Sequence, residues 1–325
     1  MVRGKYIVFF IVLATLWSCQ REPDIQLTIH ECASMPDGRA SCACFVLGDQ
    51  AYIFGGRDAE GNHLNDMWRY TPATDSWENL GTTPLMERVN STACIYGDKV
   101  YLGLGFHGKH GQDSCYLRDW WEYIPATNQW TRLADYPNHY TDRATSFVGE
   151  NELYVGYGFS WNYRRDMFRY SIADNRWDSI DVGVSFHGYP TRSFGGTGCD
   201  CQGRHFMGTG YFRNSLNWWA EFLPEGRWKK RTEVPGRKRT LAATTATEQY
   251  IYLCGGIHYG GVNTTGEMLQ DMRRYDPQTD KWQWVAILPQ PLINHICFAI
   301  NGKVYFGLGE NQDCEVLNRL YCIEE

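Results

Sequence analysis

One short pattern recurs along this chain at intervals of roughly fifty residues. An apolar, aromatic stretch that ends in glycine occurs in six copies. Self-similarity at a period of this size is typical of repeat architectures, in which each repeat folds into the same supersecondary unit. This repeat limits the fold more than any other feature of the sequence. The copies cover residues 52–56, 101–105, 154–158, 206–210, 252–256 and 305–309.

Two further elements follow the glycine stretch in a fixed order. A second stretch ends in an aromatic residue, as at residues 66–70, and in five copies a turn rich in Pro, Asp, Asn and Gly then leads to a tryptophan. These turn residues favour β-hairpins. Aromatic residues make up 15% of the chain, which also favours an all-β fold of many short strands. The tryptophans are Trp77, Trp130, Trp177, Trp228 and Trp282.

The ordered glycines, tyrosine and tryptophan resemble the Kelch repeat, and the resemblance covers nearly all of the chain after residue 24. It implies that each copy is a four-stranded antiparallel blade and that the six blades stack around one axis. The expected fold class is therefore all-β, a six-bladed Kelch β-propeller closed by an N-terminal strand. Only copies one and five keep adjacent glycines, while the other four read Gly-x-Gly. Small residues before each glycine stretch, such as residues 41–47, are expected to form the innermost strand.

Five tryptophans against six glycine stretches indicate that one blade lacks its outermost strand. In four copies a proline follows the tryptophan by seven residues, and counting back seven from Pro36 leads to Ile29. We expect residues 25–34 to complete blade six by pairing with residues 316–323, with Ile29 opposite Tyr321. Such closure removes an open sheet edge. It also places the N-terminal tether near the seam between blades six and one.

The chain is thus divided into a signal segment, a tether and one propeller, at residues 1–18, 19–24 and 25–325. The expected blades one to six are residues 37–83, 86–136, 142–183, 191–234, 238–288, and 293–325 together with 25–34.

The first residues carry an export signal. Arg3 and Lys5 precede an apolar stretch at residues 6–16, which is too short to cross a bilayer as a helix of about 20 residues. The ending Leu-x-Ser-Cys at residues 16–19 resembles a bacterial lipobox and implies a lipoprotein acylated on Cys19. The hypothesis is an exported protein, lipid-anchored to the bacterial outer membrane on a side that the sequence leaves open. The alternative is an ordinary signal peptide with a chance cysteine.

Net charge and motif content limit the classes of partner. The chain has a net charge of -6 and only a short basic run at residues 229–239, so no nucleic-acid partner is expected. No cofactor is expected either. The expected partners are the lipid bilayer through Cys19, an outer-membrane protein complex, and an acidic glycan or other small anion.

The twelve cysteines are interpreted mainly as small buried residues, with disulfides as the alternative. Leaving out Cys19 makes an odd number, and six cysteines lie where the crowded innermost strands are expected. A Cys32–Cys322 disulfide is attractive, but with Ile29 opposite Tyr321 the two cysteines are about four residues out of register. Two Cys-x-Cys pairs occur without a histidine at a matching spacing, so no metal site is expected. The six cysteines are Cys42, Cys44, Cys94, Cys199, Cys201 and Cys297.

Basic and aromatic residues gather where the loops of one face are expected. An arginine precedes the innermost strand in five copies and a histidine takes this place in the sixth, so these side chains are expected to ring the axis. Guanidinium groups match carboxylates, and aromatic faces stack on sugar rings and cations. The alternative is that the recurrent arginine braces neighbouring blades or binds loop carbonyls. The predicted ligand-binding residues are Arg39, Arg88, Arg143, Arg192, Arg239, His295, Phe106, Trp161, Tyr211 and Tyr259.

Two functions from different classes follow. The first is a binding or scaffolding module for a glycan, an anionic small molecule or a membrane protein, since propellers offer wide rigid faces and no catalytic motif is recognisable. The second rests on a resemblance to bacterial six-bladed Kelch propellers that act as sialic acid mutarotases or epimerases. Opening a sugar ring needs one acid and one base. The candidate catalytic residues are Arg143, Arg192, His187 and His258.

Overall fold

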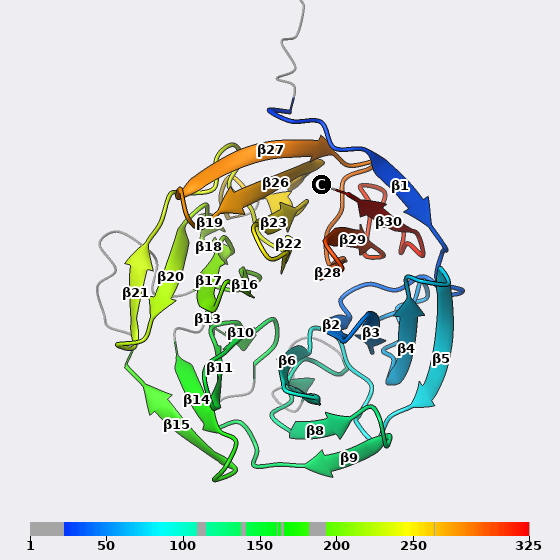
Figure 1. Ribbon diagram of the computed structural model, residues 1–325, viewed down its shortest axis with the longest axis vertical. Coiled ribbons are helices and arrows are strands. Elements are labelled where there is room, and N and C mark those ends of the chain that lie inside the picture. Colours follow the sequence, from blue (N-terminus) through cyan, green and yellow to red (C-terminus); the bar gives the residue numbers. More distant parts are fainter. Residues whose placement is uncertain are drawn as a thin grey trace, which may run out of the picture.

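Each repeat folds into one four-stranded antiparallel sheet, and six such sheets stand in a ring around a central axis in the computed structural model (Figure 1). This ring confirms the expected all-β, six-bladed propeller. The structure describes residues 23–108, 115–137, 141–160, 162–163, 166–181, 193–262 and 264–324. Within these ranges, no helix is long and apolar enough to cross a membrane.

The four strands of each blade are called A to D from the axis outward. Strand A is β2 (Ala43–Leu47), β6 (Thr92–Tyr96), β10 (Thr145–Val148), β16 (Thr197–Cys201), β22 (Ala243–Ala246) and β28 (Ile296–Ile300) in blades one to six. Strand B is β3 (Gln50–Phe54), β7 (Lys99–Gly103), β11 (Glu152–Gly156), β17 (Arg204–Gly208), β23 (Ile251–Cys254) and β29 (Lys303–Gly307).

Strands C and D form the outer half of each blade. Strand C is β4 (Asp66–Thr71), β8 (Trp120–Ile124), β14 (Met167–Ser171), β20 (Trp219–Leu223), β26 (Asp271–Asp276) and β30 (Leu320–Ile323). Strand D is β5 (Ser76–Thr82), β9 (Gln129–Arg132), β15 (Arg176–Ile180), β21 (Arg227–Lys230), β27 (Lys281–Ile287) and β1 (Ile29–Cys32).

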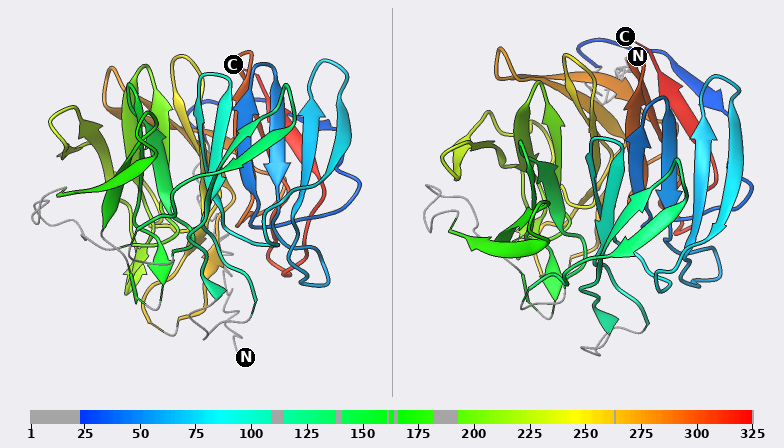
Figure 2. Two further views of the ribbon diagram at one scale, coloured as in Figure 1. Left: turned by 90° about the horizontal axis from the view of Figure 1, so that it is seen from below. Right: turned by 60° about the horizontal axis from the view of Figure 1, so that its bottom comes forward.

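The loops between strands B and C extend from one face of the ring (Figure 2). Three of them contain short hairpins, which are β12 (Phe159–Ser160) with β13 (Asn162–Tyr163), β18 (Tyr211–Phe212) with β19 (Asn214–Ser215), and β24 (Ile257–His258) with β25 (Glu267–Met268).

Hydrophobic clusters fill the spaces between neighbouring blades, one cluster at each of the six interfaces. The aromatic residue opposite the repeat tryptophan, near the end of strand C, is buried in blades one to five, from Tyr275 at 0% exposure to Phe222 at 5%, and in blade six Ile323 takes its place at 1%. In blade one its ring lies against the tryptophan of the repeat, with the Tyr70 and Trp77 centroids 4.9 Å apart. The residues that define the repeat are therefore those that hold the blades together.

The last glycine of each repeat is where the backbone of one blade meets the next. In blade one the Gly56 amide donates a hydrogen bond to the Arg88 carbonyl of blade two, at 2.9 Å. The equivalent bond at the end of the ring runs from the Gly309 amide to the Arg39 carbonyl, also at 2.9 Å. A Cβ on Gly56 would stand 2.6 Å from the Ala40 carbonyl oxygen, and φ there is 91°. This close contact explains why all six copies keep the last glycine.

Strand β1 closes the ring as strand D of blade six, paired with β30 (Figure 1). The predicted register was wrong by two residues, because Ile29 lies opposite Ile323 and Glu31 opposite Tyr321. In the other blades a hairpin turn sets the register between strands C and D, whereas β1 and β30 are separate ends of the chain. Strand β1 nevertheless keeps the register of those hairpins, and the prediction failed because Ile323, not Tyr321, holds the place of Tyr70: it pairs with Val304 as Tyr70 pairs with Ala51.

The chain reaches β1 along the outer edge of blade five. The Ile25 amide donates to the Trp284 carbonyl at 3.1 Å, and the Leu27 amide donates to the Val285 carbonyl at 2.9 Å. Ile25 and Leu27 also pack against the cluster between blades five and six. The N-terminal segment therefore lies beside blade five, not at the expected seam between blades six and one.

Candidate ligand site at the axial mouth

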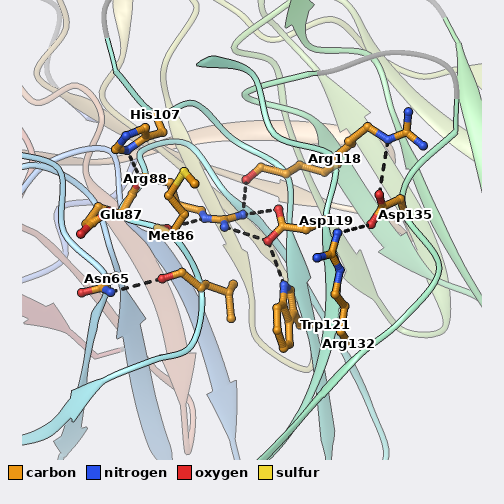
Figure 3. Close-up of polar contacts among 12 residues, drawn as sticks. Asn65, Met86, Glu87, Arg88, His107, Arg118, Asp119, Trp121, Arg132 and Asp135 are labelled. Carbon is orange, nitrogen blue, oxygen red and sulfur yellow. Dashed lines mark hydrogen bonds and ion pairs between the residues drawn. The ribbon is translucent and has the colours of Figure 1, made fainter. Parts of the chain in front are cut away.

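Three of the predicted ligand-binding arginines are buried inside their own blades. Arg39, Arg88 and Arg239 are at most 2% exposed. The Arg88 guanidinium donates to both carboxylate oxygens of Asp119, at 2.6 and 2.8 Å, and to the Leu104 carbonyl at 3.1 Å. Figure 3 shows how Arg88 and Asp119 face each other. All three arginines therefore fit the alternative interpretation of the sequence, in which the recurrent arginine braces the blades or binds loop carbonyls. The equivalent pairs are Arg39 with Asp66 and Arg239 with Asp271.

These pairs keep the three aspartates ionised. Burial of Asp119 acts to raise its pKa, but the hydrogen bonds and charge of Arg88 outweigh burial and hold the pKa below its usual value. The pKa values of Asp66 and Asp271 are lowered by the same balance. No ligand is needed to compensate these arginines, because each already has a carboxylate partner.

The position of the repeat that Arg39, Arg88 and Arg239 occupy is called the bracing position, and it carries an arginine in only three blades. The residue after it forms a β-bridge with the segment beyond strand B, as Ala40 does with Arg57. Judged by this bridge, Arg143 lies two residues beyond the bracing position of blade three, and His295 lies three residues beyond that of blade six. Arg143 and His295 therefore occupy a different position of the repeat from Arg39. The residues at the bracing position of blades three, four and six are Thr141, Ser193 and Leu292.

One residue from each blade surrounds the axis at the start of strand A, and this ring is called the axial mouth. All of its members have a left-handed backbone, with φ from 50° to 60°. The ring is hydrogen-bonded between blades, for example from the Ser41 amide to the Asn294 carbonyl at 2.8 Å. Left-handed residues other than glycine are uncommon and cluster at functional sites. The members are Ser41, Asn90, Arg143, Gly195, Leu241 and Asn294.

A cavity of about 140 Å³ is lined by the axial mouth and the next residue of each blade. Behind it, a second cavity of about 260 Å³ follows the axis between the A strands, where small side chains, hydroxyl groups and thiols line the wall. The predicted strand-A cysteines Cys44 and Cys297 belong to this wall. Among the described residues that line the mouth cavity, Arg143 is the one with a permanent charge. The mouth is thus the opening of a polar channel with a single fixed cation.

Arg143 is held in place from one side. Its Nη1 donates to Oδ2 of Asp142 at 2.7 Å, and the same oxygen accepts a hydrogen bond from Asn90 Nδ2 at 3.1 Å. The side chain of Asp142 is 1% exposed and that of Arg143 is 23% exposed. Asp142 thus orients the guanidinium while part of it stays accessible from the cavity.

Aromatic side chains of blades four and five stand next to Arg143. The guanidinium carbon lies 5.9 Å from the centroid of the Phe194 ring. Phe194, Tyr211 and Tyr259 form a row with 5.7 Å between successive centroids. Burial raises the pKa of Tyr259, Tyr211 adds to this, and the charge of Arg143 opposes it. The structure therefore brings the predicted residues Arg143, Tyr211 and Tyr259 together.

A carboxylate from blade six completes the surroundings. Glu310 is 8% exposed, forms an ion pair with Arg57 at 2.7 Å and accepts a hydrogen bond from Asn294 Nδ2 at 2.8 Å. Its charge also acts to raise the pKa of Tyr259. Like Asp142, Glu310 has a cationic partner of its own, but Glu310 and Arg57 lie outside the lining of the mouth cavity.

His295 is a buried imidazole that lines both the mouth cavity and the channel. Burial lowers its pKa to about 4, so the ring is neutral at pH 7. Neither ring nitrogen has a partner in normal hydrogen-bond geometry within the described ranges, and the polar group beside the ring is the backbone of Cys254. A neutral imidazole can offer a ligand one donor and one acceptor.

The remaining predicted residues lie elsewhere. Phe106 is 3% exposed and packs with Val89 and Tyr116 in a small cluster of its own. His258 lies in β24 with its Nδ1 2.8 Å from the Lys238 carbonyl oxygen, and it does not line the mouth cavity. In the part of the chain that the structure describes, no group of three His, Cys, Asp or Glu residues could hold a metal. The predicted residues outside the described ranges are Cys19, Trp161, His187 and Arg192.

Several residues of the site were missed by the sequence analysis, among them Asn90, Asn294, Asp142 and Glu310. Asn90 and Asn294 occupy the same position of the repeat, and asparagine tolerates a left-handed backbone better than most residues. A recurring asparagine two residues after the bracing position was therefore an available signal. Asp142 and Glu310 each occur in one blade only, so no periodic pattern marks them.

A family model described as the KLHDC2/KLHL20/DRC7 Kelch-repeats domain matches residues 21–210. The chain is also similar to Kelch-like protein 35 of Mus musculus, with 23% identity over 305 residues that cover 87% of this chain and 48% of the relative. Kelch-like protein 23 of Homo sapiens is 24% identical over 276 residues, which cover 82% and 45%. The chain spans about half the length of these curated relatives.

Among solved structures, the chain is similar to the one titled "Structure of YjhT", with a TM-score of 0.74. The alignment covers 90% of this chain and 97% of YjhT at 15% sequence identity. At this identity the similarity shows the fold alone.

Proposed function

This chain belongs to the KLHDC2/KLHL20/DRC7 Kelch-repeats domain family, and from that premise we propose that it is a binding module that captures a small carboxylate-bearing molecule at its axial mouth. The observation that carries the proposal is Arg143. Its guanidinium is 23% exposed, is oriented by Asp142 through Nη1, and borders a cavity on the axis. A guanidinium held in this way is suited to a carboxylate, with which it forms charge-assisted hydrogen bonds.

The rest of the mouth supports an acidic sugar as the class of ligand. Tyr211 and Tyr259 offer aromatic faces beside Arg143, and such faces stack on sugar rings. Ser41 and Asn90 add neutral hydrogen-bonding groups at the rim, and His295 adds one at the inner end. Ligand hydroxyl groups need neutral partners of this kind, while the carboxylate needs Arg143.

Isothermal titration calorimetry with N-acetylneuraminate and glucuronate, and with glucose as the neutral comparison, tests the proposal. We expect at least one acidic sugar to bind and glucose not to bind. Arg143→Ala should weaken that binding at least tenfold, because it removes a charged hydrogen bond. Arg69→Ala is the matched control, since Arg69 pairs with Glu78 on the outer strands of blade one. Equal affinity of the Arg143→Ala variant and the parent would disprove the role of the mouth.

A sugar mutarotase or epimerase acting on sialic acid or a related acidic sugar is the second candidate. The observation in its favour is that two groups able to exchange a proton lie near Arg143, namely Tyr259 and Glu310, whose charge acts to raise the pKa of Tyr259. Anomer equilibration of N-acetylneuraminate followed by NMR measures the activity. A rate equal to that in buffer alone would show that the protein does not catalyse this reaction, and binding would remain as its proposed function.

We further propose that the protein is exported and held on the outer membrane by acyl chains on Cys19, where it serves as a partner of a membrane protein complex. The support is the lipobox-like segment at residues 16–19 and the apolar stretch before it. Metabolic labelling with a palmitate analogue should mark the parent and not Cys19→Ser. Label on the variant, or no label on the parent, would contradict the anchor.

A further inference from the structure

Two cysteines meet in the seam where β1 closes the ring. Cys32 of β1 lies opposite Leu320, and Cys322 of β30 lies opposite His30, so the cysteines are diagonal neighbours in an antiparallel pair. Residues related in this way point to the same face of a sheet. Both cysteines pack against the hydrophobic cluster between blades six and one. We propose that Cys32 and Cys322 form a disulfide bond that closes the ring covalently.

The observed register is what makes this pair feasible. The sequence placed the two cysteines about four residues out of register, whereas the structure places them two residues apart along the ladder. The thiols are also direct neighbours. Burial raises the pKa of Cys32 to about 12, and a hydrogen bond with the Cys322 thiol acts in the same direction. Two independent features, the strand register and the thiol contact, therefore point to the same pair.

The position of β1 allows the small movement that a disulfide needs. Diagonal residues have Cα atoms about 7–8 Å apart, while a disulfide requires about 4.4–6.8 Å. The strands must therefore approach each other by about 1 Å. Strand β1 is the outermost of blade six and its ladder runs to β30 alone, so a shift disturbs no second ladder, while the hydrogen bonds of Ala33 with Asp75 and Trp77 of blade one must follow the shift.

A second pair of thiols lacks this freedom. Cys254 and Cys297 are also hydrogen-bonding neighbours, across the interface of blades five and six. Cys254 is fully buried on β23, which is held between β22 and β26. The same chemistry is therefore expected in the seam and not at this inner pair.

Bond formation transfers two electrons from the cysteines to an external disulfide, for which oxidised glutathione is the representative oxidant. The Cys32 thiolate attacks one glutathione sulfur, forms a mixed disulfide and releases one glutathione thiolate. The Cys322 thiolate then attacks the Cys32 sulfur and releases the second. The two protons of the cysteine thiols end on the two released glutathione molecules.

The test uses the full-length protein equilibrated with reduced or with oxidised glutathione. Free thiols are blocked with N-ethylmaleimide in denaturant, and the peptides are mapped by mass spectrometry. We expect a linked Cys32–Cys322 peptide after oxidation and two separate, blocked peptides after reduction. Because the bond closes nearly the whole propeller into one loop, the Tm of the oxidised protein should exceed that of the reduced protein by roughly 5 °C or more.

Cys32→Ser and Cys314→Ser are the matched variants. Cys314 is exposed in the B–C loop of blade six, so its removal should leave the linked peptide and the Tm difference unchanged. Cys32→Ser should abolish both, and mapping of the parent protein decides the question if that variant does not fold. Blocked Cys32 and Cys322 in the oxidised, folded parent would overturn the proposal. A bond from either residue to any other cysteine would do the same.

Discussion

Arg88 shows how this protein keeps a guanidinium in its interior. The side chain is 1% exposed, and its nitrogens donate to Asp119 and to the carbonyls of Leu104 and Met86 (Figure 3). A buried ion pair adds little stability compared with an apolar pair of the same shape, but breaking it leaves an uncompensated charge. The role of the pair is therefore positional, because it fixes the entry of strand A relative to strand C.

We expect Arg88→Met to lower the free energy of unfolding by about 3 kcal/mol or more, because Asp119 is left without its partner. Arg69→Met is the control, since its ion pair with Glu78 is exposed and contributes less than about 1 kcal/mol. Urea denaturation followed by tryptophan fluorescence measures both losses. Equal losses in the two variants would show that burial of the ion pair does not change what its removal costs in free energy of unfolding.

His295 gives the stability of the fold a pH dependence with a defined window. Burial lowers its pKa from 6.5 to about 4, so the unfolded chain binds a proton at a higher pH than the folded chain. This contribution to stability is therefore lost as the pH falls from about 6.5 to about 4. We expect Tm to decrease across this range, and to decrease less in His295→Gln. An unchanged slope in the variant, with exposed His30→Gln as control, would contradict this assignment.

The sequence identified the right kinds of residue at this scale but not which of them reach the axis. Arg39 and Arg143 both precede strand A by a few residues, and only the β-bridge shows that they occupy different positions. Arg39 lies before the left-handed residue Ser41, whereas Arg143 is itself the left-handed residue of its blade. A local turn of the backbone thus separates an interior brace from an axial side chain, and periodicity does not encode that turn.

In blades one, three and five the C–D hairpin is tied to the preceding blade through one residue of its turn. In blade five the Asp280 carboxylate accepts hydrogen bonds from the Tyr275 hydroxyl at 2.6 Å and from the Thr232 amide of blade four at 2.9 Å. The Trp282 indole donates to the Thr232 carbonyl at 2.9 Å. The C–D hairpin of blade five therefore also acts as a clamp, meaning that its hydrogen bonds link blade five to blade four. The equivalent turn residues of blades one and three are Asp75 and Asn175.

Asn175 fills this role with an amide, so the negative charge is not required. We expect Asp280→Asn to change the free energy of unfolding by less than about 0.5 kcal/mol. Asp280→Ala should lower it by about 1–3 kcal/mol, because the Thr232 amide and Tyr275 hydroxyl lose their acceptor. Denaturant titration distinguishes the two, and equal effects would refute the clamp.

Hairpins were the best predicted elements, because the turn residues and the tryptophan after them are local signals. Strand A was predicted less well. Residues 41–47 were expected as the strand of blade one, but β2 begins at Ala43 because Ser41 has a φ of 60°. The left-handed residue interrupts the extended chain, and no local sequence rule requires a serine to adopt it.

Closure of the whole ring depends on two segments that are far apart in sequence. Strand β1 pairs with β30 through four residues, and Ile25 and Leu27 add to the edge of blade five. The sequence predicted this closure from the missing tryptophan, but the register was missed because Ile323 replaces the repeat aromatic of strand C in blade six, and Tyr321 was taken in its place. No local signal in the sequence indicates the path of the N-terminal segment along blade five.

Deletion of residues 23–34 should expose the edge of β30 and the interblade clusters beside it. We expect the shortened protein to unfold at a lower Tm and to form aggregates, because an unpaired edge strand recruits other chains. Size-exclusion chromatography with light scattering and thermal scans measure both effects. Glu31→Ala keeps the strand and removes only an exposed ion pair with Arg319, so it should behave like the parent. A monomeric deletion variant with unchanged Tm would contradict this account of closure.

The first and last strands of the propeller pair in one sheet. The geometry of the ring therefore allows a chain that begins at a different blade. Ile323 at the end of β30 faces Ile29 at the start of β1, so a short turn that replaces residues 1–28 would make an ordinary hairpin there. The chain would then be circular. It could be opened in any exposed connection between blades, such as the one between β5 and β6, to give a circular permutant with the same six sheets.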